Sequence, residues 1–183
     1  MRAAEVFIIA VLVVPCVAVS GESLGVFLGS SHMYIGDSSN TYEVEADGIC
    51  GGLLVPVHLV SFPLYLKVKA LYHGADYTAW NGDVYEGYVQ VSNSAVFTLD
   101  VVGNSSWSVQ GGGGIGIQNE SAYSQWGEGV SAAEVFAEVS AVITHSSSWC
   151  RFGLMVTYEH GFNSEDVLLV TEDRAQVAVV SFF

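Results

Sequence analysis

Residues 86–102 read Glu-Gly-Tyr-Val-Gln-Val-Ser-Asn-Ser-Ala-Val-Phe-Thr-Leu-Asp-Val-Val, and this stretch decides the fold. Most of the alternate residues from position 89 onward are apolar, as at Val89, Val91 and Phe97, whereas most of the residues between them are small and polar. A period of two residues belongs to a β-strand with one apolar and one polar face. Because most strands hold about 5–6 residues, a strand this long predicts a tall sheet such as the wall of a barrel.

The same alternation recurs along the chain after residue 21. It predicts eight strands, over residues 22–34, 41–60, 64–74, 86–102, 107–118, 131–144, 149–159 and 173–183. Long connections are expected at residues 35–40, 75–85, 119–130 and 161–172, and short turns at residues 61–63, 103–106 and 145–148. Long and short connections that alternate in this way are typical of transmembrane barrels. The sequence therefore predicts an all-β fold, an eight-stranded antiparallel up-and-down transmembrane β-barrel.

The second predicted strand changes the polarity of one face midway. Glu43, Glu45 and Asp47 are acidic, whereas Leu53 and the following residues of the same parity are apolar. A β-bulge or a glycine bend reverses the faces of a strand. We therefore expect a β-bulge or a glycine bend at residues 50–52.

The first 20 residues have the features of a secretory signal peptide. Arg2 precedes a short apolar run, and the small residues Ala18 and Ser20 fit the cleavage rule. The run is shorter than the roughly 20 apolar residues that a membrane-spanning helix needs. We therefore expect cleavage before Gly21 and one exported domain over residues 21–183.

The chain is acidic, with five Lys and Arg residues, 19 Asp and Glu residues and a formal net charge of −14. A surface of this sign repels polyanions, which excludes nucleic acid as a partner. The five histidines are scattered without the spacing of a metal site, so we expect neither a metal nor a cofactor. Export would permit a disulfide between Cys50 and Cys150, but their positions on the predicted strands favour free thiols.

Alternation alone does not decide whether the apolar faces point into the barrel or out of it. A secreted, lipocalin-like barrel would bind an apolar ligand inside and expose its polar faces. Two features favour a membrane barrel instead. The polar faces of the later strands carry glycine, serine and isolated charges and lack the dense Lys and Glu mixture of a soluble surface. Aromatic residues that would form two interfacial girdles fall at both ends of the strands: Phe62, Trp107 and Trp149 beside short turns, and Tyr72, Tyr85 and Tyr158 beside long loops.

The leader, the alternating strands and the C-terminal Phe183 together resemble the small outer-membrane β-barrels of the OmpA/OmpX type. The resemblance covers the whole chain after the leader and rests on pattern, without a diagnostic motif. It implies a bacterial outer-membrane location, contact with outer-membrane lipid, and assembly by the barrel-assembly machinery, for which Phe183 is the candidate signal. It also implies a structural role, or surface recognition through external loops whose ligand the sequence does not specify.

With the apolar faces outward, the charged side chains of the strands face the lumen. The predicted cluster contains Lys67, Lys69, Asp100, Glu134, Glu138 and Arg151, and Gln110 and Gln176 accompany it. Unpaired charges in a narrow lumen are unfavourable, and an eight-stranded barrel is filled by its own side chains. We therefore predict a salt-bridged plug, with a narrow passive pore lined by the same charges as the alternative.

An enzymatic alternative rests on His145, Ser147 and Glu159. Their order resembles the His, Ser and Glu of outer-membrane lipid A 3-O-deacylases, although Ser147 lies in a run of serines without that family's fuller motif. The predicted strand places His145 at a short turn and Glu159 roughly 30 Å away. Because a triad needs hydrogen-bond contact, no catalytic residue is expected.

Overall fold

The computed structural model describes residues 24–36, 43–57, 64–73, 77–78, 84–124, 129–148, 150–162 and 171–183. The strands in these ranges are β1 (Gly25–Gly36), β2 (Glu43–Val57), β3 (Leu64–His73), β4 (Tyr77–Thr78), β5 (Val84–Gly103), β6 (Trp107–Ser124), β7 (Gly129–Ser146), β8 (Arg151–Phe162) and β9 (Thr171–Phe182). Among the described residues, none forms a helix long and apolar enough to cross a bilayer. The predicted leader lies outside these ranges.

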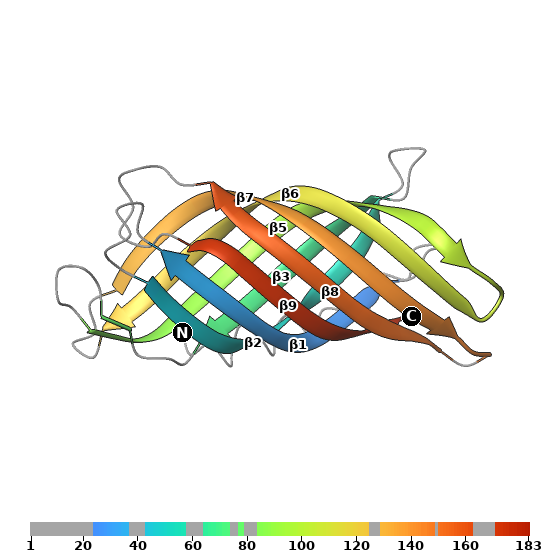
Figure 1. Cartoon of the computed structure of the whole chain (residues 1–183), viewed down its shortest axis with the longest axis horizontal. Helices are drawn as coiled ribbons and strands as arrows, with labels where there is room; N and C mark the ends of the chain where they lie inside the picture. The colour runs from blue at the N-terminus through green and yellow to red at the C-terminus, as the bar shows by residue number, and fades with distance from the viewer. Residues whose placement is uncertain are drawn as a thin grey trace.

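Eight long strands close into a barrel within the described ranges (Figure 1). Their order is β3-β2-β1-β9-β8-β7-β6-β5, every pair is antiparallel, and pairing of β3 with β5 closes the ring. The two-residue β4 pairs with the start of β5 and belongs to the connection between β3 and β5. The predicted eight-stranded, up-and-down antiparallel barrel is confirmed.

The strands are staggered around the barrel. Following paired residues from Arg151 through each strand in turn returns to β8 at Gly161, ten residues further along. Such a stagger tilts the strands of an eight-stranded barrel by about 40° and leaves room only for side chains. We call the end that carries the connections at residues 104–106 and 147–150 the short-turn end, and the opposite end the loop end.

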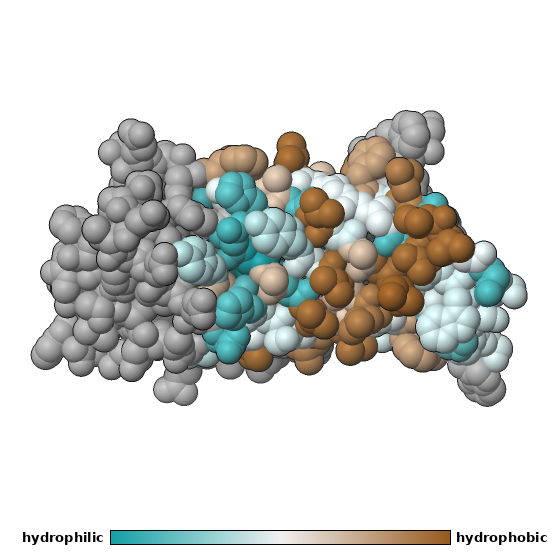
Figure 2. All heavy atoms as spheres, viewed as in Figure 1, coloured by the Kyte–Doolittle hydropathy of each residue, from teal (hydrophilic) through white to brown (hydrophobic). Residues whose placement is uncertain are grey.

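Side chains alternate between the interior and the outer wall. On β7, Phe136 and Glu138 are buried, whereas Val135 and Val139 are exposed. Each long strand contributes exposed apolar side chains, for example Leu28, Ile49, Leu66, Phe97, Ile115, Val139, Val156 and Val179. Figure 2 shows such residues gathered on the middle and right of the visible wall, with hydrophilic ones nearer the loop end. This distribution is the reverse of the one expected for a soluble lipocalin-like barrel.

The reversal of faces predicted at residues 50–52, by a β-bulge or a glycine bend, is wrong, because Cys50 and Leu54 both face the interior. The register of β2 with β1 and with β3 runs without interruption through these residues. Asp47 and Ile49 are both exposed on the outer wall, with Asp47 nearer the loop end. The change of polarity therefore follows height along one face, as expected where a barrel passes from polar surroundings into hydrocarbon.

Five strands are longer than predicted, β8 and β9 by one residue and β5, β6 and β7 by three or more. β6 and β7 both reach into residues 119–130, so the long loop expected there is mostly strand, and β5 already begins at Val84. Because Val135 pairs with Phe162, the last residue of β8, β7 continues past the end of its neighbour. β5, β6 and β7 therefore extend the wall at the loop end.

Candidate functional site in the barrel interior

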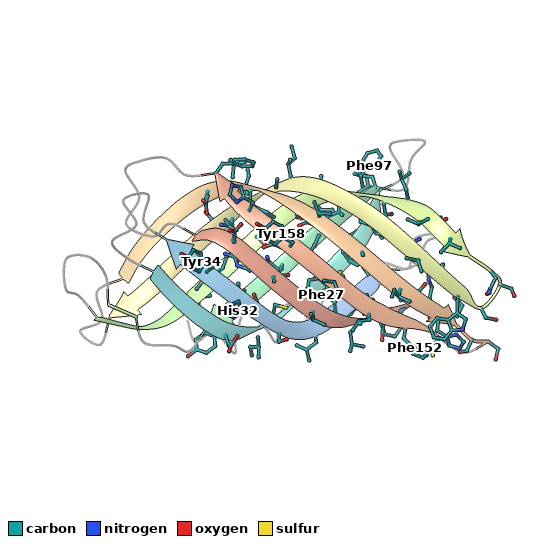
Figure 3. The ribbon with its side chains drawn as sticks, viewed as in Figure 1. Phe27, His32, Tyr34, Phe97, Phe152 and Tyr158 are labelled. Atoms are coloured by element: carbon teal, nitrogen blue, oxygen red, sulfur yellow. The ribbon has the colours of Figure 1, made fainter. Side chains whose placement is uncertain are left out.

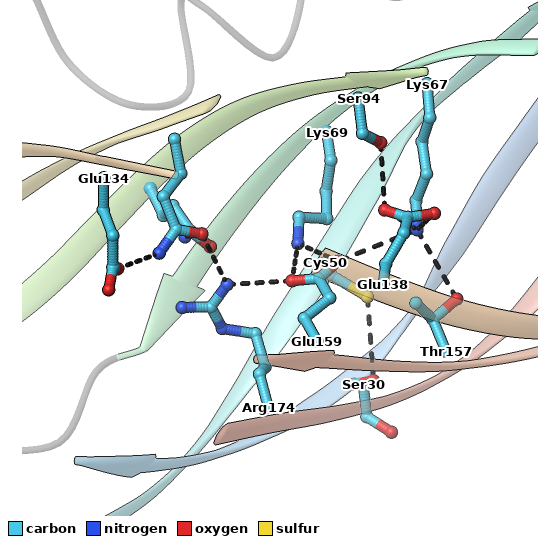
Figure 4. Close-up of polar contacts among 12 residues, drawn as sticks. Ser30, Cys50, Lys67, Lys69, Ser94, Glu134, Glu138, Thr157, Glu159 and Arg174 are labelled. Carbon is cyan, nitrogen blue, oxygen red and sulfur yellow. Dashed lines mark hydrogen bonds and ion pairs between the residues drawn. The ribbon is translucent and has the colours of Figure 1, made fainter. Parts of the chain in front are cut away.

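A buried ionic network crosses the interior of the barrel. At its first centre, a carboxylate oxygen of Glu159 on β8 lies 2.5 Å from Lys69 Nζ on β3 and 2.9 Å from Arg174 Nη1 on β9 (Figure 4). The three side chains are at most 2% exposed. Because β3 lies opposite β8 in the strand order, the charge-assisted bond between Lys69 and Glu159 connects opposite walls of the barrel. Arg174 is the register partner of Glu159 on the neighbouring strand β9.

Glu138 on β7 is the second centre of the network. Lys67 Nζ lies 3.4 Å from both carboxylate oxygens of Glu138 and 3.4 Å from Thr157 Oγ1. The same ammonium is 3.7 Å from Glu159, which joins the two centres. Ser94 Oγ donates a 2.9 Å hydrogen bond to Glu138.

Amide side chains continue the network toward the loop end. Arg174 Nη1 donates a 3.2 Å hydrogen bond to Gln118 Oε1, which also accepts one from Gln90. Gln118 Nε2 in turn donates a 2.5 Å hydrogen bond to Glu134. The charges of this network within the described residues are those of Lys67, Lys69, Arg174, Glu134, Glu138 and Glu159. Cations and carboxylates are equal in number, so the network is neutral when all six groups are ionised.

The structure brings together some of the predicted lumen charges and not others. Those in the network are Lys67, Lys69, Glu138 and, at its partly buried edge, Glu134. Asp100 is exposed at the short-turn end beside a register shift of β5, where it accepts a 2.8 Å hydrogen bond from Gln110. Arg151 lies over the ring of Phe182, 4.7 Å from its centroid. The prediction that Asp100 and Arg151 join the cluster is wrong.

Asp100 and Arg151 do not join the network because the interior near the short-turn end is apolar. A buried cluster there contains Phe27, Leu54, Val142, Met155, Ala178, Val180 and Phe182, with Tyr65 packed against it. We call this cluster the apolar floor. Figure 3 places Phe27 within the barrel, whereas Phe97 and Phe152 lie on the outside. A charge buried among these side chains would lose its hydration without gaining a partner.

Glu159 and Arg174 were not predicted as lumen residues, although the alternation carries a signal for each. Glu159 follows Tyr158, which is exposed, and Arg174 has the parity of Gln176, which is buried. Both lie near the strand ends at the loop end, beside segments expected to be loops. The period of two residues, followed to the end of each strand, would have found them.

Within the described part of the chain, no three His, Cys, Asp or Glu side chains lie close enough together to hold a metal ion. Cys50 is buried, with Sγ 3.6 Å from the carbonyl oxygen of Ser30, and Cys150 is exposed. Both are free, which confirms the prediction for these two thiols.

The residues of the enzymatic alternative are far apart. The ring of His145 lies between those of Trp107 and Phe152, with centroids 4.5 Å and 5.5 Å away. Glu159 is seven residues further along β8 than Phe152, the register partner of His145, which is about 23 Å along the strand. The structure therefore does not bring His145 and Glu159 into the contact that a triad needs.

Aromatic side chains are exposed toward both ends of the outer wall. Among the predicted girdle residues these are Trp107 at the short-turn end and Tyr72 and Tyr158 toward the loop end. Phe62, Trp149 and the side chain of Tyr85 lie outside the described residues. The C-terminal Phe183 is 77% exposed, whereas its neighbour Phe182 is buried in the apolar floor.

No protein-family model matches the sequence, and the comparison with curated proteins finds no match. Comparison with solved structures does find similar proteins. The chain is similar to Neisserial surface protein A, with a TM-score of 0.59 and 9% identity over 87% of this chain and 95% of that one. It is similar to the N-terminal β-barrel domain of Pseudomonas aeruginosa OprF, with a TM-score of 0.52 and 13% identity over 90% and 100% of the two chains.

A third similar structure is Ail, the attachment invasion locus protein of Yersinia pestis, with a TM-score of 0.51 and 12% identity over 88% of this chain and 99% of that one. At identities this low the likeness concerns the fold, and activity and partners need evidence of their own. The strand order, the outward apolar wall and these likenesses agree. This chain has the fold of the small eight-stranded outer-membrane β-barrels.

Proposed function

We propose that this chain is an integral outer-membrane protein whose barrel is a closed, filled scaffold and not a channel. The observation that carries the proposal is the distribution of side chains, with ions inside the barrel and apolar groups outside it. Lys69 and Glu159 are almost completely buried, whereas Val139 is 64% exposed. A soluble protein of this size buries apolar residues such as Val139 and exposes charged residues such as Lys69 and Glu159.

The height of the apolar outer wall fits a bilayer. On β7 the exposed apolar side chains run from Val135 to Ile143, about 26 Å along the strand and about 20 Å along the barrel axis at a tilt of 40°. Outer-membrane barrels carry an apolar band of about 25 Å between their aromatic girdles. Trp107 and Phe152 are exposed below this stretch and Tyr72 toward its upper end, as girdle residues are in such proteins.

The filled interior supports a scaffold over the alternative of a narrow pore. The ionic network and the apolar floor follow one another along the barrel axis, so a solute would have to displace paired ions and then packed apolar side chains. The network needs no ion from solution, because Lys67, Lys69, Arg174, Glu138 and Glu159 all form ion pairs with one another, and Glu134 at its edge brings the sum of the charges to zero.

Export and assembly belong to the same proposal. The leader is cleaved before Gly21, the barrel-assembly machinery reads Phe183, and outer-membrane lipid surrounds the finished wall. The exposure of Phe183 on the outside of the barrel suits a residue that another protein reads. The extension of β5, β6 and β7 supports the loop end, where surface recognition of a still unspecified ligand would take place.

The test uses the full chain expressed in a bacterium with an outer membrane. We expect the protein in the outer-membrane fraction, extractable only with detergent and migrating faster on a gel before boiling than after. Recovery in a soluble fraction without detergent would contradict the membrane location. Purified protein in a planar bilayer is expected to give no single-channel steps, and stable steps would contradict the filled lumen.

A further inference from the structure

A small cavity separates the pair formed by Lys67 and Glu138 from the apolar floor. Its polar lining residues include Lys67, Thr98, Gln110, Glu138 and Ser140, and Met155 is among the apolar ones. The space in which the centre of a water molecule can lie measures about 20 Å³. A single water needs about 10–15 Å³ by this measure, so the cavity has room for one or two waters and for no larger ligand.

Thr98 gives the cavity an unsatisfied hydrogen-bonding group. Its side chain is 7% exposed, and its hydroxyl has no hydrogen-bond partner in the structure. A buried hydroxyl without a partner is unfavourable, because folding has removed its bonds to water and replaced them with nothing. Thr98 is one of the residues that line the cavity, and its hydroxyl oxygen is itself buried. A water within hydrogen-bond distance of this oxygen would complete its bonding.

The Lys67 ammonium on another wall of the cavity is also weakly bonded. Its contacts with Glu138, Thr157 and Glu159 are 3.4 Å or longer. Hydrogen bonds between an ammonium and an oxygen are normally about 2.7–2.9 Å, and those of Lys69 with Glu159 are 2.5 and 2.6 Å. A water at normal distance would therefore give Lys67 a stronger hydrogen bond than any of these contacts.

We propose that this cavity is an ordered internal water site. One or two waters accept a hydrogen bond from Lys67, bond to the hydroxyl of Thr98, and connect the ionic network to β5 above the apolar floor. The inference rests on the filled lumen proposed above, because in an open pore the same space would hold exchanging solvent. The interior is then sealed by a hydrated polar layer resting on an apolar one.

The direction in which one substitution moves the urea midpoint distinguishes a cavity that holds water from an empty one. Thr98→Val replaces the hydroxyl by a methyl group of nearly equal size. With water present, the substitution removes one of its partners, and we expect a lower urea midpoint for unfolding of the barrel. In a dry cavity the substitution removes an unsatisfied hydroxyl, and the midpoint would rise. Thr98→Ser is the matched control, since it keeps the hydroxyl and reports the effect of the lost methyl group alone.

Two further measurements keep the outcomes separate. In a high-resolution crystal structure of the full barrel we expect solvent density within hydrogen-bond distance of Thr98 Oγ1, and empty density there would overturn the water site even if Thr98→Val fails to assemble. Single-channel steps from the unmodified protein would instead overturn the filled lumen. A silent bilayer together with a raised midpoint for Thr98→Val would overturn the water site and leave the scaffold intact.

Discussion

Glu159→Gln removes the charge that joins the two halves of the ionic network while keeping the shape of the side chain. Lys69 and Arg174 then face a neutral amide at the distances of 2.5 and 2.9 Å where they now meet a carboxylate. Lys67, 3.7 Å away, loses a second counter-ion. Removing one partner of a buried ion pair destabilises a protein by about 3–5 kcal/mol, because the other charge stays buried without compensation. Since several cations share Glu159, we expect a loss near the upper end of that range.

Lys69→Met provides the comparison from the other side of the bond. Glu159 keeps Arg174 as a direct partner, so the expected loss is smaller, about 2 kcal/mol, as for a buried group that loses one hydrogen-bond partner. The double variant should lose less stability than the sum of the two single losses, by at least about 1 kcal/mol, because the two residues share one bond. Asp100→Asn is the matched control, an exposed carboxylate outside the network, and should change the stability by less than about 0.5 kcal/mol.

The assay is urea unfolding of the barrel in lipid vesicles, followed by the gel shift between folded and unfolded forms. A Glu159→Gln barrel within about 1 kcal/mol of the unmodified protein would refute a network in which that carboxylate is the shared counter-ion. So would a larger loss for Lys69→Met than for Glu159→Gln, because it would place the critical charge on the lysine.

Three further predictions follow from burial and packing. A membrane-permeant maleimide should label Cys150 and not Cys50 in the folded barrel, and both after denaturation, as read by mass spectrometry; labelling of folded Cys50 would contradict its place in the interior. Gly112→Ala puts a Cβ 2.0 Å from a β5 carbonyl oxygen and should destabilise by about 1–3 kcal/mol, whereas at Gly111 the nearest atom is 3.4 Å away and alanine should be tolerated; equal midpoints would refute the packing argument. Val139→Arg places a charge midway along the apolar wall and should destabilise the barrel in vesicles by about 2–4 kcal/mol, and an unchanged urea midpoint would contradict lipid contact there.

The period of two residues carried most of the fold from the sequence. It located all eight long strands, and it put Lys67, Lys69 and Glu138 on inward faces because their strand neighbours are apolar. One of its failures arises because polarity in a membrane barrel varies along the axis as well as between faces. Asp47 and Ile49 of β2 share one outer face at different heights, and the sequence pattern does not distinguish such a change of polarity from a reversal of the faces.

The side chains inside the barrel and their contacts were harder to predict from the sequence. Met155 and Phe182 are apolar and face inward, so a rule that assigns apolar residues to lipid cannot place them in the apolar floor. The partners of the buried charges were equally hidden, because the contact between Glu159 and Arg174 depends on a register between strands that alternation does not fix. Packing across a closed barrel is a property of all the strands together, and no single strand encodes it.

The most direct test of an apolar outside and a filled inside is a scan of spin-label accessibility along residues 135–143 of β7. Each position is labelled in turn on a Cys50→Ser, Cys150→Ser background, and collision with oxygen, which dissolves in lipid, is compared with collision with a water-soluble nickel complex. We predict that the exposed odd-numbered positions such as Val139 collide with oxygen alone, and that the even-numbered ones such as Glu138 collide with neither reagent. Nickel collisions at the odd positions would mean a water-soluble barrel, and nickel collisions at the even positions would mean an open pore.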